Sequence, residues 1–283
     1  MTQRVTIDDL QQRKHRGEKI TMLTAYDYPM AKLLDAAGVD AILVGDSLSM
    51  VVLGYDSTTP VTMDEMVHHA KAARRGVDRA LLIGDLPAMA LQGSASDTVR
   101  HATRFVREAN CDAVKVEWKE GMDHAAHAMV ESGIAVMGHV GLTPQTAAAE
   151  GGFGLRGKDA ASAARIVSQA EALEQAGCFG MVLECVPDVV AQTITQRLRI
   201  PTIGIGSGPS CDGQVVVTYD LLGLFDRFHP SFVKQYANLG AAINQAAGDY
   251  IRDVKTGMFP AREHTKTMAA SERETFLKLV TPA

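Results

Sequence analysis

The sequence predicts a single (β/α)8 barrel, the TIM-barrel fold, on three observations. Short apolar runs recur along the 283 residues, helix-like segments separate them, and polar side chains stand where several of the runs end. Continuous apolar runs of this length are typical of strands covered on both faces, as in a parallel sheet. Eight such repeats in about 250 residues match the usual size of this barrel.

The predicted strands are spaced so that most pairs leave room for a helix between them. In chain order they are Ile20–Ala25, Ala41–Gly45, Ala80–Asp85, Ala113–Glu117, Ile134–His139, Met181–Glu184, Thr202–Gly206 and, as the weakest run, Leu221–Phe228. An open doubly wound sheet is the alternative fold. We disfavour it because no GxGxxG motif follows the first strand, and because polar residues end many strands rather than gathering at one switch point.

The segments between the strands carry helix signals. Asp97–Ala109 and Ala160–Ala176 are amphipathic and rich in Ala, Glu, Gln and Arg. The run from Thr62 to Glu65 has the pattern of a capping box, and it predicts a helix that continues through Arg75. Left-handed C-terminal caps are expected at three glycines that follow helical runs, Gly38, Gly133 and Gly177.

One domain is expected across residues 1–283, because the chain has no Pro- or Ser-rich linker and no break in composition. From about residue 253 to residue 283 we expect a polar, partly helical extension of the barrel. Leu48–Thr59 and Leu142–Lys158 are long and rich in Gly, Thr and Pro, so both are expected as loops over the mouth of the barrel.

Composition and charge exclude several classes of partner. The net charge is −5 and the pI is about 6.0, so no basic surface is expected to neutralise the phosphates of a nucleic acid. The longest apolar runs are too short to span a bilayer, and the first residues lack the apolar centre of a signal peptide. None of the four cysteines forms a CxxC pair, which favours reduced thiols. We therefore expect a cytoplasmic protein that binds neither nucleic acid nor membranes.

Acidic residues close four of the predicted strands, and they carry the strongest functional signal. Asp46, Asp85, Glu117 and Glu184 would meet at one face, because the carboxyl ends of parallel barrel strands lie together. Lys115 points to the same side of its strand as Glu117. A lone aspartate after a strand is often a helix cap, and a lone lysine often reaches solvent. Several carboxylates brought together repel one another unless a cation lies between them, and a set of oxygen ligands favours Mg2+ over zinc.

Other polar residues allow two interpretations each. His139 ends the fifth strand and could donate to a ligand oxygen or serve the packing of the barrel. The glycine-rich run Gly204–Gln214 does not match a P-loop, so it could bind phosphate or simply let a substrate approach the backbone. Four further histidines have no metalloprotease spacing and are expected on the surface or at an interface: His68, His69, His124 and His127.

These strand-end motifs resemble those of the ketopantoate hydroxymethyltransferase family, over about residues 4 to 265. The matching stretches are Thr21–Gly38, Leu43–Met66, Gly84–Ala90, Val114–Glu117, Gly138–Gln145, Leu183–Pro187 and Ile203–Gln214. The sequence departs from the common pattern at Ser49 and Ser207, where many members have glycine and alanine. The wider superfamily is that of phosphoenolpyruvate mutase and isocitrate lyase, whose barrels bind 2-oxo acids on Mg2+.

The resemblance implies an enzyme of pantothenate biosynthesis. It would transfer a hydroxymethyl group from 5,10-methylenetetrahydrofolate to 3-methyl-2-oxobutanoate, giving ketopantoate (2-dehydropantoate) and tetrahydrofolate. The site residues that it implies are Asp46, Asp85 and Glu117 for one Mg2+ per subunit, Asp46, Ser47, Asp85 and Lys115 for the substrate, and Glu184 as the proton acceptor. The family is also cytoplasmic and homo-oligomeric, commonly a decamer.

Alternatives remain open within this frame. The chain could be another Mg-dependent 2-oxo acid lyase or mutase of the same superfamily. Lys115 could instead form a Schiff base, as in metal-independent aldolases, or the barrel could be an inactive scaffold. Glu184 could take the proton from C3 of the substrate or act at a folate nitrogen. The residues of the folate pocket are not indicated by any motif.

Overall fold

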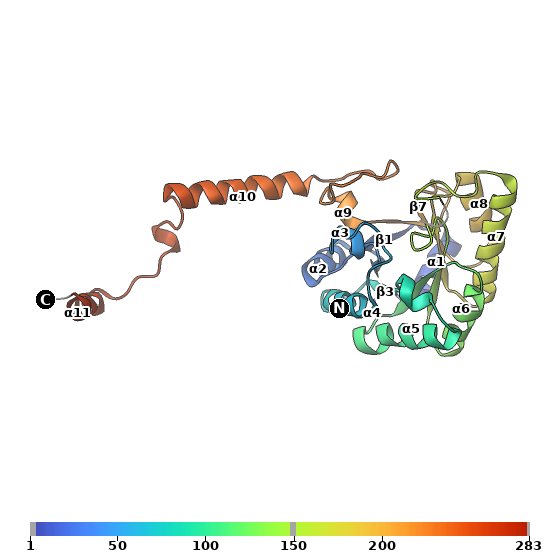
Figure 1. Ribbon diagram of the computed structural model, residues 1–283, viewed down its shortest axis with the longest axis horizontal. Helices are drawn as coiled ribbons and strands as arrows, with labels where there is room; N and C mark the ends of the chain where they lie inside the picture. Colours follow the sequence, from blue (N-terminus) through green and yellow to red (C-terminus); the bar gives the residue numbers. More distant parts are fainter. Residues whose placement is uncertain (1–3, 148–150, 282–283) are drawn as a thin grey trace. The chain divides into compact units, whose positions relative to one another are not determined.

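Eight parallel strands close into a barrel in the order in which they occur in the sequence (Figure 1). The computed structural model describes residues 4–147 and 151–281. The strands are β1 (Ile20–Thr24), β2 (Ala41–Val44), β3 (Leu81–Asp85), β4 (Ala113–Glu117), β5 (Val136–Gly141), β6 (Gly180–Glu184), β7 (Thr202–Ile205) and β8 (Gly213–Val216). Strand β1 pairs with both β2 and β8, which closes the sheet and confirms the predicted fold class.

Helices surround the barrel on the outside (Figure 1). In the first part of the chain they are α1 (Ile7–Arg16), α2 (Tyr28–Ala37), α3 (Leu48–Val51), α4 (Met63–Arg74), α5 (Ala95–Ala109), α6 (Met122–Glu131), α7 (Ala160–Gln175), α8 (Asp188–Arg197) and α9 (Thr218–Leu221), with a 3-10 turn, η1 (Ala88–Leu91). The capping box predicted for α4 is present, with the Thr62 hydroxyl accepting from the amide of Glu65. Three helix-ending glycines have the expected positive φ: Gly38, Gly133 and Gly177.

The eighth strand was predicted at the wrong place. Leu221–Phe228 is not a strand; Leu221 ends α9, and Phe225 packs edge-to-face on Phe228. The strand is Gly213–Val216, which pairs with β7 and β1. It has only four residues, and it starts inside the glycine-rich run that the sequence favoured as a loop. A strand of four residues gives only a weak periodic signal in the sequence.

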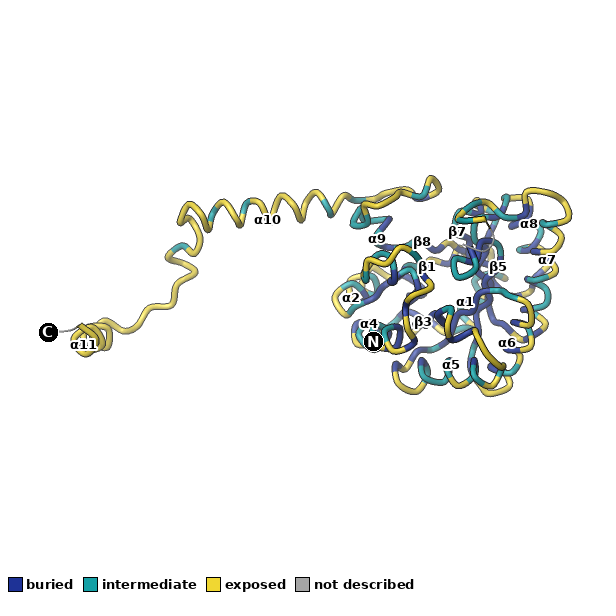
Figure 2. Tube along the Cα trace, in the orientation of Figure 1, coloured by how far each residue is buried: buried dark blue, intermediate teal, exposed yellow. Residues whose placement is uncertain are grey.

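Two layers of apolar side chains fill the barrel unit. Inward-facing residues such as Met22, Ile83 and Ile203 form one cluster, which also includes Leu10 of α1. Outward-facing residues such as Val114 and Val116 join the cluster between strands and helices. Most strand residues are accordingly buried, while the outer faces of the helices are exposed (Figure 2). This packing holds the carboxyl ends of the strands at fixed positions.

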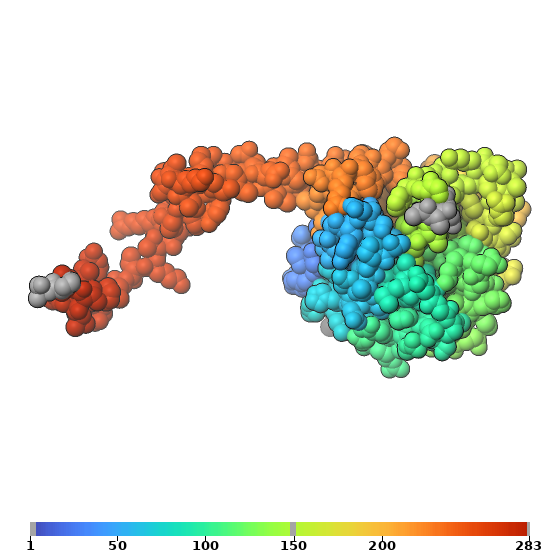
Figure 3. Space-filling model, viewed as in Figure 1, coloured from blue at the N-terminus to red at the C-terminus, as the bar shows by residue number. Residues whose placement is uncertain are grey.

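The two predicted mouth segments differ in structure. Leu48–Thr59 contains the short helix α3, whereas the described part of Leu142–Lys158 forms turns and coil. Residues 148–150 of the second segment lie outside the described residues. Chain around residues 55–60 (bright blue) and around residues 153–158 (yellow-green) is visible on the same face of the barrel unit in Figure 3. Thr58 and Pro144 from these segments line the cavity at the strand ends, so both segments reach the mouth.

The chain divides into two compact units, Met1–Gln235 and Tyr236–Ala283. The second unit contains α10 (Leu239–Thr256), the turn η2 (Arg262–His264) and α11 (Ala270–Val280), and none of these elements has a buried residue. Residue 253, where the sequence placed the start of the extension, lies within α10. The single-domain organisation stays a prediction.

Within residues 4–147 and 151–281, no helix is long and apolar enough to cross a membrane.

Candidate functional site

The carboxyl ends of β2 to β6 bring the predicted site residues into one cavity of about 100 Å3. Its wall includes every side chain that the sequence singled out there: Asp46, Ser47, Asp85, Lys115, Glu117, His139 and Glu184. Strand β4 explains two of them, because Val114 and Val116 pack outward while Lys115 and Glu117 alternate with them and point inward. Its register places Lys115 beside Asp85 of β3 and Glu117 beside His139 of β5.

Among the described residues that line this cavity, Lys115 is the only lysine or arginine. Its Nζ lies 2.8 Å from Asp85 Oδ1 and 4.0 Å from Glu117 Oε1. All three side chains are almost completely buried. Burial acts to lower the pKa of Lys115, but the Asp85 carboxylate and then the other acids raise it above its usual value. The lysine is therefore held as an ammonium ion.

His139 connects Lys115 to Glu184. Its Nδ1 lies 3.3 Å from Lys115 Nζ, and its Nε2 lies 3.3 Å from Glu184 Oε2. Burial, together with the nearby ammonium, holds the pKa of His139 well below its usual value, so the ring is neutral. Because an ammonium can only donate, Nδ1 accepts and the ring proton resides on Nε2, which lies near Glu184 but makes no hydrogen bond to any described residue. Of the two interpretations of His139, its place among the charged groups favours a role in the site.

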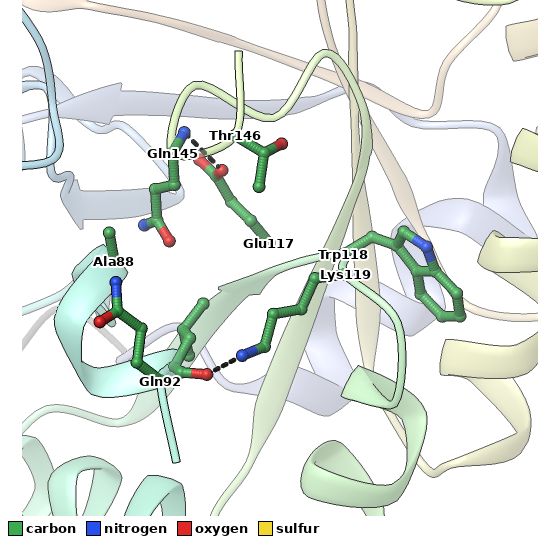
Figure 4. Close-up of a pocket in the computed structure, with 8 residues that line it drawn as sticks. Ala88, Gln92, Glu117, Trp118, Lys119, Gln145 and Thr146 are labelled. Carbon is green, nitrogen blue, oxygen red and sulfur yellow. Dashed lines mark hydrogen bonds between the residues drawn. The ribbon is translucent and has the colours of Figure 1, made fainter. Parts of the chain in front are cut away.

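Gln145 belongs to the site, although sequence reasoning assigned it no role. Its side-chain Nε2 donates to Asp46 Oδ2 at 2.9 Å and to the carbonyl oxygen of Leu86. Its backbone amide donates to Glu117 Oε2 at 3.0 Å, which Figure 4 shows as the dashed line between the two residues. One loop residue thus fixes carboxylates from two strands. It lies at the end of the matching stretch Gly138–Gln145, which was its only signal in the sequence.

Negative charge exceeds positive charge in this cavity. Four carboxylates face one ammonium and a neutral imidazole. Burial raises the pKa of Asp85 to about 7, despite the attraction of Lys115. Burial, and then repulsion from Asp46, raises the pKa of Glu117 well above its usual value. The carboxylates of the site therefore repel one another when ionised, and a bound dication would reduce this repulsion.

The carboxylates of the cavity are the kind of ligand that Mg2+ prefers, but they do not lie close enough together to bind one ion. Glu117 Oε1 accepts no hydrogen bond from any residue that the structure describes, which leaves a buried carboxylate oxygen available as a ligand. In the described part of the chain, however, no three acidic, histidine or cysteine side chains are close enough together to hold a metal ion. The ammonium of Lys115 lies among the carboxylates instead. Metal binding would require these side chains to move closer together.

Glu184 is held where β5 and β6 end. The backbone approaches closely here, because the amide of Leu142 donates to the carbonyl oxygen of Glu184 at 2.8 Å. A Cβ on Gly141 would lie 2.3 Å from the same oxygen, so only glycine fits. Ser207, one of the departures from the family pattern, donates to the carbonyl of Leu183 and accepts from the amide of Val186. Burial raises the pKa of Glu184 to about 7, which suits a group that both takes and gives protons.

Ser47 and Ser49 hold the segment after β2. The Ser47 hydroxyl lies 2.9 Å from the phenol oxygen of the buried Tyr26. Ser49, the second departure from the family pattern, donates to the carbonyl oxygen of Ser57 at 2.7 Å and so closes the mouth segment onto itself. The amide of Asp46 donates to Asp85 Oδ2 at 3.1 Å. The contact with Tyr26 holds the Ser47 hydroxyl, and Ser47 lies in the wall of the cavity.

A second, larger cavity of about 470 Å3 adjoins the first. The two share several wall residues, namely Ser47, Thr58, Pro144, Glu184, Ile205 and Val217. Its remaining wall is mostly apolar and includes Phe153, Phe228 and Phe232. Sequence reasoning missed this cavity, since its residues come from distant segments and share no motif.

Comparison with known proteins identifies the relatives of the chain. Residues 4–262 match the family described as ketopantoate hydroxymethyltransferase. The chain is 55% identical to a protein of Moorella thermoacetica called 3-methyl-2-oxobutanoate hydroxymethyltransferase, over 93% of this chain and 97% of the relative. A protein of the same name from Heliobacterium modesticaldum is 51% identical over 94% and 96%.

Solved structures with the same fold are more distant in sequence. A phosphonopyruvate hydrolase in complex with oxalate and Mg++ aligns with a TM-score of 0.59 at 13% identity, over 98% of this chain and 99% of that one. A 2,3-dimethylmalate lyase of the phosphoenolpyruvate mutase/isocitrate lyase superfamily aligns with a TM-score of 0.59 at 14% identity, over 96% and 97%. These likenesses support the barrel fold alone.

Proposed function

Because the chain belongs to the ketopantoate hydroxymethyltransferase family, we propose that it converts 3-methyl-2-oxobutanoate to ketopantoate with 5,10-methylenetetrahydrofolate as the one-carbon donor, in the first step of pantothenate biosynthesis. The observation that carries the proposal is the buried cavity in which Asp46, Asp85, Glu117 and Glu184 surround the single ammonium of Lys115. Such a site can hold a small 2-oxo acid and move a proton beside its carbonyl group.

Asp46, Asp85 and Glu117 would hold one Mg2+ per subunit. When bound, the ion would supply a Lewis acid that stabilises negative charge developing on the keto oxygen. Lys115 would attract the substrate carboxylate, and the Ser47 hydroxyl, oriented by Tyr26, would donate to it. The cavity of about 100 Å3 suits a small substrate of this kind.

Glu184 would take the C3 proton or move a proton at a folate nitrogen. A pKa of about 7 allows it to accept a proton and release it again within one turnover. The proton of His139 Nε2 faces this carboxylate and would stabilise its ionised form. The new bond from C3 to the one-carbon unit replaces the C3–H bond. Water then supplies the hydroxyl oxygen of the product as the bond between that carbon and the folate nitrogen breaks, and the nitrogen takes up a proton to give tetrahydrofolate.

The state of Lys115 argues against an aldolase that works through a Schiff base. Such a lysine must lose its proton to attack a carbonyl, and enzymes achieve this by lowering its pKa. Here the Asp85 carboxylate, 2.8 Å away, raises the pKa of Lys115 instead. The charge of Lys115 is therefore better suited to binding an anion than to forming a covalent bond.

We also propose a cytoplasmic homo-oligomer, of decameric size by family resemblance. Exposed apolar residues of α10 and α11, among them Ile243, Tyr250 and Leu279, support association with further copies. Analytical ultracentrifugation of the full chain measures the number of subunits directly, and a monomer would contradict this part of the proposal.

The function is tested by a folate-dependent assay for ketopantoate. We expect purified protein with Mg2+, 5,10-methylenetetrahydrofolate and 3-methyl-2-oxobutanoate to form ketopantoate and tetrahydrofolate in equal amounts. Chelation by EDTA should abolish turnover, and added Mg2+ should restore it. Turnover of another 2-oxo acid without any folate would instead favour a lyase or mutase.

A further inference from the structure

The larger cavity contains a buried carboxylate with an unsatisfied oxygen. Asp220 of α9 lies in its wall and is only 7% exposed. Its Oδ1 has no hydrogen-bond partner among the described residues, although its surroundings are largely apolar. Burial raises the pKa of this carboxyl to about 6, and the nearby His229 opposes this rise. An unpaired acid of this kind calls for a ligand that brings N–H groups.

The walls around Asp220 favour a flat aromatic ligand. Phe153, Phe228 and Phe232 border the cavity and leave 58%, 50% and 43% of their surfaces exposed. Phe232 is held against the backbone of Gly206, where a Cβ would lie 2.8 Å from its ring. Aromatic side chains exposed at a cavity gain contact area and stacking when a ring covers them.

We propose that this cavity binds the reduced pterin ring of the folate co-substrate and that Asp220 pairs with its aminopyrimidinone edge. This edge presents N–H donors, and a carboxylate is a strong acceptor for such donors. The volume of about 470 Å3 lies within the usual range of small-molecule sites. The inference rests on the proposed function, since it supplies the binding site that the folate-dependent reaction requires.

The arrangement of the two cavities agrees with this assignment. Glu184 belongs to both walls, so a folate ring bound in the larger cavity would lie next to the carboxylate proposed to move protons. Cys185 adjoins Glu184 in the same wall and has a positive φ of 48°, a conformation that few non-glycine residues adopt.

Asp220→Asn tests the assignment with almost no change in shape. Calorimetric titration of the intact protein with tetrahydrofolate should show binding about 10- to 100-fold weaker than in the unchanged protein, the usual loss for hydrogen bonds to a charged group. The matched control is Asp226→Asn, because Asp226 is exposed on the neighbouring segment. It should bind tetrahydrofolate as the unchanged protein does. Thermal melting and titration with 3-methyl-2-oxobutanoate in Mg2+ check that each variant is folded.

A second ligand makes the test specific for the pairing. An analogue of tetrahydrofolate without the 2-amino group should bind weakly to the unchanged protein, and Asp220→Asn should lose this discrimination. If the unchanged protein turns over folate while Asp220→Asn binds both ligands with unchanged affinity, the inference fails and the proposed function stands. If the unchanged protein neither binds nor turns over folate, both fail.

Discussion

The two cavities at the barrel mouth work by opposite physical means. The smaller one is lined by carboxylates, an ammonium and an imidazole, so charge dominates its binding. The larger one is lined mainly by apolar and aromatic side chains around Asp220 and the shared Glu184, so shape and stacking dominate. Glu184 lies in the wall that they share. The proposed proton-transfer group therefore lies between the cavity proposed for the small 2-oxo acid and the cavity proposed for the folate ring.

Removing charge from the smaller cavity should have the largest effect. Asp85→Asn takes away the partner of Lys115 and one proposed Mg2+ ligand, so we expect kcat to fall by about 10^3-fold or more. The measurement is steady-state formation of ketopantoate at saturating Mg2+. Asp56→Asn serves as the control, because Asp56 is fully exposed and should leave kcat unchanged. A fall of less than tenfold in Asp85→Asn would contradict a central role for this acid.

Glu184→Gln should have the next largest effect, because it removes proton transfer while keeping the shape. We expect a fall in kcat of about 10^2- to 10^3-fold. Loss of the C3 proton, followed by NMR in deuterated water, then separates the two roles: unchanged exchange would exclude Glu184 as the C3 base. If it is that base, kcat/KM should rise with pH around its pKa of about 7, since only the carboxylate accepts a proton. Glu120→Gln, at an exposed position, is the control.

Gln145→Ala should weaken the smaller cavity without removing a charge. Its amide orients Asp46, so we expect the Mg2+ concentration for half-maximal activity to rise about 10- to 100-fold. Activity measured over a range of Mg2+ concentrations gives this value. Gln92→Ala is the control, because Gln92 is an exposed glutamine that lines the same pocket as Gln145 and Glu117 (Figure 4). This variant should leave the Mg2+ concentration for half-maximal activity unchanged. Equal Mg2+ dependence in both variants would show that Gln145 does not position the acids.

The smallest effect concerns stability and pH. The pKa values of Asp85 and Glu184 are raised by folding to about 7, so the folded state binds more protons than the unfolded state between about pH 4 and pH 7. Stability in EDTA should therefore fall as pH rises through this window. Because Mg2+ binds the ionised acids, it should raise the melting temperature by several degrees at about pH 8 and by less at about pH 5. If Mg2+ raised the melting temperature equally at both pH values, the ion would not be binding the ionised form of these acids, which would contradict the prediction.

The sequence predicted the smaller cavity well because its chemistry is local to strand ends. Each acid ends a recognisable apolar run, and barrel topology places such ends on one face. Gln145 could not be found this way, since a single amide in a loop has no pattern that separates it from surface residues. Asp220 and the phenylalanines were hidden for the same reason, and β8 was hidden among glycines. What escaped prediction was contact between segments that are distant in the chain.

The most direct test of the account is hydrogen–deuterium exchange at C3 of 3-methyl-2-oxobutanoate, followed by NMR without any folate. We predict that the protein catalyses this exchange with Mg2+ and that EDTA stops it, because the buried carboxylates need a dication to hold the 2-oxo acid. Exchange that continues at the same rate in EDTA would contradict the central claim.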